Sequence, residues 1–184
     1  MKIGITGGIG SGKSYVCKLL NKRGINIYDC DDAAKRIINT SSVIHEKLIT
    51  LIGNDIFING TLNKQKMKEF LLASGANTQR INEIVHPEVA RDFVSSGSQW
   101  MECAILFESG FNRLVDKKIM ISAPLEMRIK RIMERNKINR SKALEWIQRQ
   151  WVEDDVRKLC DYEIINDGKR KLDYQIDIIL DKLK

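Results

Sequence analysis

The sequence lacks the features of a membrane-spanning, secreted or disulfide-stabilised protein. No apolar run approaches the roughly 20 residues of a transmembrane helix, and the opening residues, MKIG, show no signal peptide. Two histidines are too few for a zinc site without cysteine help. We therefore expect a cytoplasmic protein with reduced thiols, no zinc site and no membrane association. The cysteines are scattered and form no C-x-x-C pair: Cys17, Cys30, Cys103 and Cys160.

The composition indicates an ordinary globular protein. The 184 residues are 43% hydrophobic and 30% charged, enough for one compact unit with inserted subdomains and a sizeable core. The formal net charge of +7 suits nucleic acid, but it equally suits small polyanions such as nucleotides. Charge alone leaves both partners open.

The strongest local signal is GGIGSGKS, residues 7–14, which matches G-x-x-x-x-G-K-[ST] between a predicted strand and a predicted helix. Glycines allow the backbone to turn successive N–H groups inward, and the helix N-terminus adds a partial positive charge. Lys13 is placed to reach the β- and γ-phosphates, and the Ser14 hydroxyl to bind Mg²⁺. The expected nucleotide-binding residues are Gly8, Gly10, Ser11, Gly12, Lys13, Ser14 and Tyr15.

The motifs of other P-loop classes are missing. No glycine has Asp three positions before it, and N-K-x-D does not occur, so a GTPase is disfavoured. The sequence also lacks the Asp-Glu box of a nucleic-acid motor. ATP as the phosphate donor and a small molecule as the acceptor fit best.

Apolar strands alternate with helical segments along the chain. Pro87 predicts a kink in one helical segment, or a new start near His86. The alternation predicts an α/β fold with a parallel sheet covered on both faces. Strands are expected at 2–6, 25–28, 100–106, 118–122 and 162–165, and helical segments at 13–22, 33–38, 43–52, 64–72, 79–94, 124–159 and 172–183.

The acidic run after the second strand contains a candidate general base. Ligands bind beyond the carboxyl ends of parallel strands, which would bring Asp29 and Asp31 near the phosphate loop. Asp31 could accept the proton of an attacking alcohol. The alternative is that Asp31 or Asp32 caps a helix beginning at Ala33, and Asp32 is the more natural cap.

Several segments together resemble the dephospho-CoA kinases. They are TGGIGSGKS at 6–14, YDCD at 28–31, HPEVARDF at 86–93, ILFESG at 105–110, APLEMRIKRIMER at 123–135, RQW at 149–151 and CDYEIINDG at 160–168. The resemblance spans about residues 3–168. Tyr15, Ala104 and Arg128 stand where this family commonly has Thr, Pro and Gln.

The resemblance implies a three-layer α/β/α P-loop fold with a five-stranded parallel sheet. The core would comprise about 1–30, 98–124 and 160–184, with a helical CoA-binding subdomain at about 31–97 and a lid at about 125–159. The implied reaction transfers a phosphoryl group from ATP, with Mg²⁺, to the ribose 3′-hydroxyl of dephospho-CoA, and Asp31 would act as base. We expect no nucleic-acid partner, and a monomer or weak homo-oligomer.

Arginines of the lid region are candidates for stabilising the transferred phosphoryl group. The segment 126–142 holds seven Lys or Arg and two Glu. The default interpretation of such a charged segment is a solvated helix face. Arg131 and Arg135 are equal candidates for the catalytic arginine, and Arg140 is a candidate substrate contact.

The remaining candidates carry weaker signals. Glu108 follows a buried strand and would hold substrate, act beyond the first shell of Mg²⁺, or start a helix. His86 and Arg91 would line the acceptor site, or His86 is structural. Asn166 could contact adenine. We interpret Trp146 and Trp151 as residues that pack in the lid or in the core.

Two other function classes stay open at this point. One is a P-loop kinase for a nucleoside or nucleotide, which acceptor competition would reveal. The other is a nucleotide-dependent binding protein, which would show salt-sensitive nucleic-acid binding.

Overall fold

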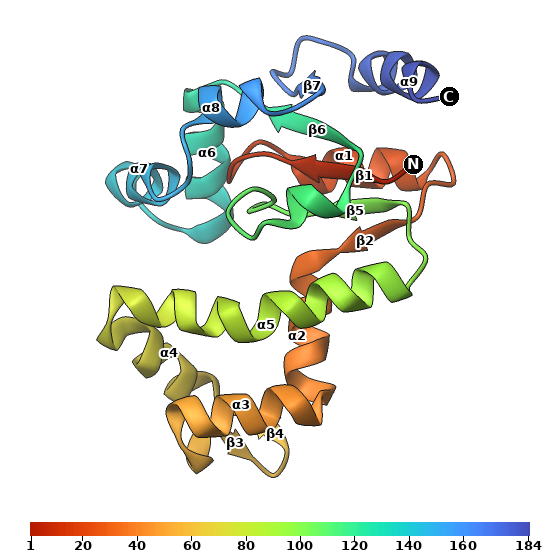
Figure 1. Cartoon of the computed structure of the whole chain (residues 1–184). Helices are drawn as coiled ribbons and strands as arrows, with labels where there is room; N and C mark the ends of the chain where they lie inside the picture. The colour runs from red at the N-terminus through yellow and green to blue at the C-terminus, as the bar shows by residue number, and fades with distance from the viewer. The chain divides into compact units, whose positions relative to one another are not determined.

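The computed structural model describes all 184 residues, which divide into two compact units. The first unit contains residues 1–28 and 98–184, and the second contains residues 29–97. Figure 1 shows that the first is built around a sheet, whereas the second is almost entirely helical. No helix combines the length and the apolar character needed to cross a bilayer.

A five-stranded sheet forms the centre of the first unit, with the order β2-β5-β1-β6-β7. The central strand β1 pairs in parallel with β5 and β6, and β6 pairs in parallel with β7, so the predicted parallel sheet is confirmed. All four residues of β1 are buried, which explains why its sequence, IGIT, contains no charged residue. The strands are β1 (Ile3–Thr6), β2 (Ile27–Asp29), β5 (Trp100–Glu102), β6 (Lys117–Ser122) and β7 (Tyr162–Ile165).

Helices α1 (Lys13–Asn21) and α9 (Leu172–Lys182) share one apolar core with this sheet. Val16 and Leu20 of α1 and Ile176 of α9 pack with Ile5 and Ile121 of the strands. The first turn of α1 directly follows the glycine-rich loop. Packing of its apolar face against the sheet therefore holds that loop beyond the end of β1.

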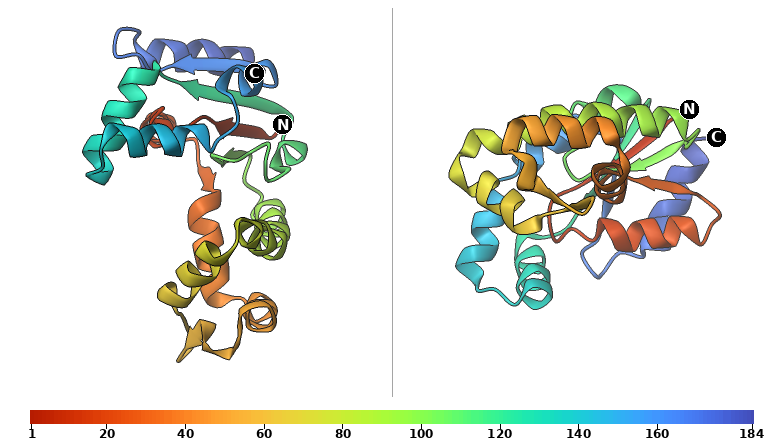
Figure 2. Two further views of the ribbon diagram at one scale, coloured as in Figure 1. Left: turned by 90° about the vertical axis from the view of Figure 1, so that its left-hand side faces the viewer. Right: turned by 90° about the horizontal axis from the view of Figure 1, so that it is seen from below.

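Three further helices surround the glycine-rich loop: α6 (Leu125–Asn136), α7 (Arg140–Gln148) and α8 (Glu153–Lys158). A small core of Ile129, Ile132 and Ala143 joins α6 to α7, and Ile9 of the loop packs against it. Figure 2 shows α6 and α7 together at one end of the sheet. Between β5 and β6 the chain adds only turns and the 3-10 helix Phe111–Leu114.

The second unit consists of four helices and one hairpin. Its core includes Ile37, Ile44, Leu48, Val85 and Phe93. The elements are α2 (Cys30–Thr40), α3 (Ser42–Ile52), the 3-10 helix Asn54–Ile56, β3 (Phe57–Ile58), β4 (Thr61–Leu62), α4 (Lys64–Ala73) and α5 (Gly75–Ser95).

Most predicted elements are confirmed, but several differ from the prediction. The helical segment predicted at 124–159 is divided into α6, α7 and α8, and the hairpin of β3 and β4 was not predicted. The strand predicted at 100–106 ends at Glu102. The prediction was too long because the apolar Leu106 is buried, but it is buried from a turn rather than from a strand. Strand β2 begins at Ile27, two residues later than expected. Helix α5 begins at Gly75 and runs through Pro87 without a new start. Ile81, Val85, Val89 and Phe93 are buried on both sides of Pro87, so the apolar face outweighs the lost hydrogen bond.

The core of the first unit should respond strongly to truncation. Ile121 is fully buried, so Ile121→Ala should lower the free energy of unfolding by about 2–5 kcal/mol. Leu72 is 76% exposed, and Leu72→Ala should change it by less than about 0.5 kcal/mol. Urea denaturation of both variants measures the difference. Equal losses would show that Ile121 does not belong to a packed core.

Candidate active site

The glycine-rich loop joins β1 to α1 and takes a conformation that its glycines make possible. Gly10 and Gly12 have φ angles of +80° and +95°, in the left-handed region. A Cβ on Gly10 would lie 2.7 Å from the Arg128 carbonyl oxygen, and a Cβ on Gly12 would lie 2.1 Å from Asn166 Nδ2. Gly12 also precedes α1 with no side-chain cap, which leaves the first N–H groups of the helix for a ligand.

The Lys13 ammonium lies at the start of this loop. Its Nζ donates to the Gly7 carbonyl oxygen at 2.9 Å and lies 3.8 Å from Glu102 Oε1. Both charged side chains are only about one tenth exposed, at 11% and 12%. Sequence reasoning missed Glu102. Its signal was an acid at the carboxyl end of a buried strand that neighbours β1.

Side chains on the outer side of the loop bind its carbonyl groups. Arg131 Nη1 donates to the carbonyl oxygens of Gly10 at 3.2 Å and Ser11 at 3.1 Å. Asn166 Nδ2 donates to the same Ser11 oxygen at 2.8 Å, and its Oδ1 accepts from Arg131 Nη2. These side chains hold the Gly10 and Ser11 carbonyls, and the Ser11 N–H donates to the Gly8 carbonyl oxygen at 3.1 Å. The first N–H groups of α1 remain for an anion.

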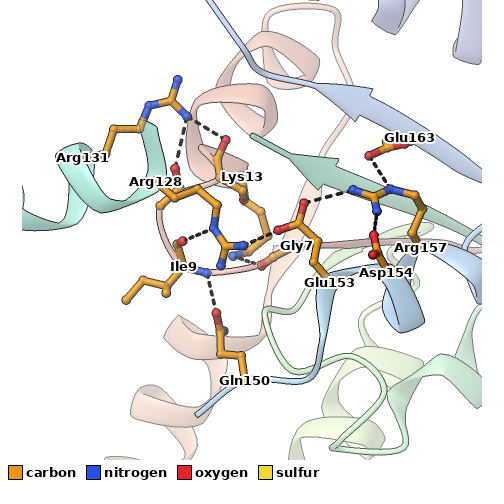
Figure 3. Close-up of polar contacts among 12 residues, drawn as sticks. Gly7, Ile9, Lys13, Arg128, Arg131, Gln150, Glu153, Asp154, Arg157 and Glu163 are labelled. Atoms are coloured by element: carbon orange, nitrogen blue, oxygen red, sulfur yellow. Dashed lines mark hydrogen bonds and ion pairs between the residues drawn. The ribbon is translucent and has the colours of Figure 1, made fainter. Parts of the chain in front are cut away.

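Both backbone polar groups of Ile9 bind side chains from α6 and from the segment after α7. Arg128 Nε donates to the Ile9 carbonyl oxygen at 3.0 Å, and the Ile9 N–H donates to Gln150 Oε1 at 2.7 Å (Figure 3). Arg128 is buried and forms an ion pair with Glu153. The sequence identified Arg128 only as an unusual lid residue, and it gave no signal for Gln150 or Glu153 as contacts.

The three predicted lid arginines occupy different surroundings. Arg131 binds the loop as described, but Arg135 is exposed and donates only to Asn136 Oδ1. Arg140 forms a two-pronged pair with Glu126, at 2.6 and 2.7 Å. Those hydrogen bonds from Arg140 hold the pKa of Glu126 below its usual range. Of the three, only Arg131 contacts the phosphate loop.

A cavity borders the beginning of the loop. Its lining includes Thr6, Gly7, Gly8, Glu108, Arg128 and Glu153. Glu108, one of the predicted site residues, is therefore at this cavity. Trp151 also lines it and stacks on Phe107 with ring centroids 6.3 Å apart, while Trp146 packs on the α6–α7 core. Trp146 therefore packs as predicted, whereas Trp151 is 50% exposed and its interpretation as a packing residue stays a prediction.

The loop has the donors that a nucleotide polyphosphate needs. Gly8, Gly10, Gly12 and Lys13 form the cradle, and the buried Ser11 hydroxyl has no hydrogen-bond partner within the protein. Ser14 and Tyr15 are exposed in the first turn of α1. No cluster of three or more His, Cys, Asp or Glu side chains is arranged for a metal. A single hydroxyl ligand fits Mg²⁺, which usually keeps waters and substrate phosphates as its other ligands.

The acidic run departs from the predicted helix cap. Asp29 caps α2, because its Oδ1 accepts from the N–H groups of Asp31 at 2.9 Å and Asp32 at 3.0 Å. The helix begins at Cys30 rather than Ala33, so the preference for Asp32 as the cap was wrong. Asp31 and Asp32 both lie exposed in the first helical turn, and Asp32 pairs with Lys35 at 2.8 Å.

His86 and Arg91 lie on α5 in the second unit. Burial lowers the pKa of His86, so the ring is neutral at pH 7. Arg91 is exposed and donates to Glu88 Oε1 at 2.6 Å.

These elements define a P-loop nucleotide-binding protein: a buried strand, a glycine-rich loop, a lysine in the first turn of a helix, and arginines around the loop. A dephospho-CoA kinase family model matches residues 1–171. A dephospho-CoA kinase of Bacteroides fragilis is 38% identical over 187 residues, covering 96% of this chain and 89% of that protein.

Solved structures share this fold. TT1252 from Thermus thermophilus has a TM-score of 0.84 at 28% identity, with 100% of this chain and 98% of that chain covered. A dephospho-CoA kinase from Campylobacter jejuni has the same fold, with a TM-score of 0.70 at 21% identity and coverage of 99% and 98%. The chain belongs to the dephospho-CoA kinase family. It is a kinase of the last step of coenzyme A biosynthesis, which implies that it uses ATP.

Substitution of Gly12 should abolish nucleotide binding through a clash that a second glycine lacks. Gly12→Ala adds backbone strain of about 1–2 kcal/mol and also displaces Asn166. Gly24 has a similar φ of +80°, but a Cβ there would meet nothing within 4 Å. Gly24→Ala should therefore lower stability while leaving the affinity for Mg-ATP unchanged. Calorimetric titration and thermal unfolding of both variants test this, and equal affinities would contradict the site geometry.

Proposed function

We propose that this kinase transfers the γ-phosphoryl group of ATP to the ribose 3′-hydroxyl of dephospho-CoA. The observation that carries the proposal is the phosphate loop: its carbonyls at Ile9, Gly10 and Ser11 are bound from outside by arginine and asparagine side chains. A loop held in this way keeps its conformation, with the first N–H groups of α1 uncapped, before any nucleotide arrives. Donors that need no reorganisation are the main means by which enzymes stabilise a transferring phosphoryl group.

The loop residues supply binding and charge neutralisation. The N–H groups of Gly8, Gly10, Gly12 and Ser14 hold the polyphosphate. Ser11 contributes its unpartnered hydroxyl, because its N–H donates to the Gly8 carbonyl oxygen at 3.1 Å. Lys13 gives up its contact with the Gly7 carbonyl and reaches the β- and γ-phosphates. The Ser14 hydroxyl would hold Mg²⁺, and the ion would supply positive charge that offsets the negative charge of the phosphates. Glu102, next to Lys13, restrains the ammonium when no nucleotide is bound.

We propose Asp31 as the group that accepts the proton of the attacking hydroxyl. Its carboxylate is exposed and has no role as a helix cap, because Asp29 fills that role. Asp32, its neighbour, is paired with Lys35. His86, Arg91, Glu108 and Arg140 remain our proposed acceptor contacts.

The lid arginines take separate tasks in this proposal. Arg131 is committed to the loop carbonyls, so it supports the loop and adds positive charge close to the phosphates. Arg135 lies one turn further along α6 and is exposed, which supports it as the arginine that reaches the transferred group. Asn166 donates from Nδ2 to the Ser11 carbonyl and accepts from Arg131 at Oδ1, so its proposed adenine contact uses the second N–H of Nδ2.

A cytoplasmic location completes the proposal. It is supported by four free cysteines, three of them buried. Burial raises the pKa of Cys160 to about 11, so this thiol stays protonated and unreactive at neutral pH.

An acceptor panel tests the reaction directly. ADP release from Mg-ATP is measured alone, with dephospho-CoA, and with a series of nucleosides and nucleoside monophosphates. We expect strong stimulation by dephospho-CoA alone. Stimulation by another acceptor would replace the substrate and keep the kinase, whereas salt-sensitive nucleic-acid binding without any stimulation would indicate a binding protein.

Replacement of the proposed base separates chemistry from binding. Asp31→Asn should lower kcat by roughly 10²–10⁴, the usual share of a general base, and leave the affinity for Mg-ATP nearly unchanged. Asp32→Asn is the matched control, because Asp32 lies in the same exposed first turn. It should keep wild-type turnover. Near-full turnover of Asp31→Asn would show that another group takes the proton.

A further inference from the structure

The ion pair between Arg128 and Glu153 has no part in the roles assigned so far. Its side chains are 6% and 25% exposed, so a charged guanidinium is almost wholly buried at the phosphate loop. Arg128 Nη1 donates to Glu153 Oε2, while Nε donates to the Ile9 carbonyl oxygen at 3.0 Å. Burial of a charge is costly unless it is paired, so the position of Glu153 decides what this arginine can do.

The pair lies at the end of the loop where the terminal phosphate is expected. Arg128 and Glu153 line the same cavity as Gly7 and Gly8. A Cβ on Gly8 would come within 2.2 Å of Arg128 Nη2, so the guanidinium lies directly against the loop backbone. The Lys13 ammonium binds the Gly7 carbonyl, and a lysine at this position reaches the β- and γ-phosphates.

The surroundings balance the charge of Arg128 in advance. Glu153 Oε1 also lies 3.2 Å from Arg157 Nη2. Arg157 in turn pairs with Asp154 and with Glu163, the latter at 3.0 Å (Figure 3). Two arginines therefore face three carboxylates, and the network holds no surplus positive charge. A polyphosphate in the loop would experience Arg128 and Glu153 as opposed charges at close range.

We propose that Arg128 is a positioning residue of the nucleotide site and that Glu153 sets how strongly its charge acts on the polyphosphate. Arg128 fixes the Ile9 carbonyl and adds positive potential at the terminal-phosphate end, and Glu153 offsets that potential. The inference rests on the proposed binding of Mg-ATP at this loop. It predicts effects of opposite sign for the two partners of one ion pair.

Three variants test the inference. Glu153→Gln keeps the shape of the side chain and removes its charge, so it should tighten the binding of Mg-ATP by about three- to tenfold. Arg128→Gln removes the positive charge and leaves Glu153 facing the cavity, so it should weaken binding by about tenfold. The double variant restores charge balance but still lacks the Arg128 bond to the Ile9 carbonyl, so it should bind Mg-ATP more tightly than Arg128→Gln and less tightly than the wild type.

Calorimetric titration with Mg-ATP at low and high salt measures these affinities, and thermal unfolding reports stability separately. Glu134→Gln and Lys130→Gln are matched controls, because this pair on α6 is exposed, at 66% and 76%, and separated by 3.9 Å. Both controls should bind Mg-ATP with nearly wild-type affinity. The gain in Glu153→Gln should shrink at high salt, as expected for a charge effect.

A merely structural pair would behave differently. Both single variants would then lose affinity and stability together, and this result would overturn the inference. If Arg128→Gln does not fold, the direction of the affinity change in Glu153→Gln alone decides whether the inference holds. If the wild-type chain binds Mg-ATP and Glu153→Gln binds it no more tightly, only this inference is refuted. No binding of Mg-ATP by the wild-type chain would refute the nucleotide site and the inference together.

Discussion

The structure of the site depends on one backbone constraint: the carbonyl groups of residues 9–11 must point out of the loop and still be hydrogen-bonded. A buried carbonyl without a partner costs about 1–3 kcal/mol. Arg128, Arg131 and Asn166 meet this demand from α6 and from the end of β7. The glycines allow the required angles, but these side chains make the angles stable. The conformation in which the loop binds phosphates therefore depends on contacts from several elements of the first unit.

Two faces of helix α6 help to keep these carbonyl groups hydrogen-bonded. Arg128 and Arg131 are three residues apart and contact the loop, while Ile129 and Ile132 hold the helix in its own apolar core with Ala143 of α7. Ile9 packs against the same core, so one loop residue is bound through its backbone and its side chain. The arginines can be aimed accurately because the apolar face fixes the rotation of the helix.

The sequence predicted features that depend on neighbours along the chain. The phosphate loop, the strand 162–165 and most helices follow from local motifs and periodicity, and the structure confirms them. The errors arise where tertiary contacts decide. Leu106 is apolar and buried but lies in a turn, so the apolar pattern of the sequence predicted a β5 that is too long. Asp29 rather than Asp32 caps α2, because β2 runs to the first residue of the acidic run. Glu102 and Gln150 became visible only when β5 and the segment after α7 were placed beside the loop.

The bond from Asn166 to Ser11 joins residues 155 positions apart in a chain of 184. During synthesis on the ribosome, the GGIGSGKS segment is made well before the side chain that anchors it. A nascent chain therefore carries the nucleotide motif for some time before the Ser11 carbonyl gains its Asn166 partner. We expect ATP to stabilise such a chain less than one in which β7 has joined the sheet.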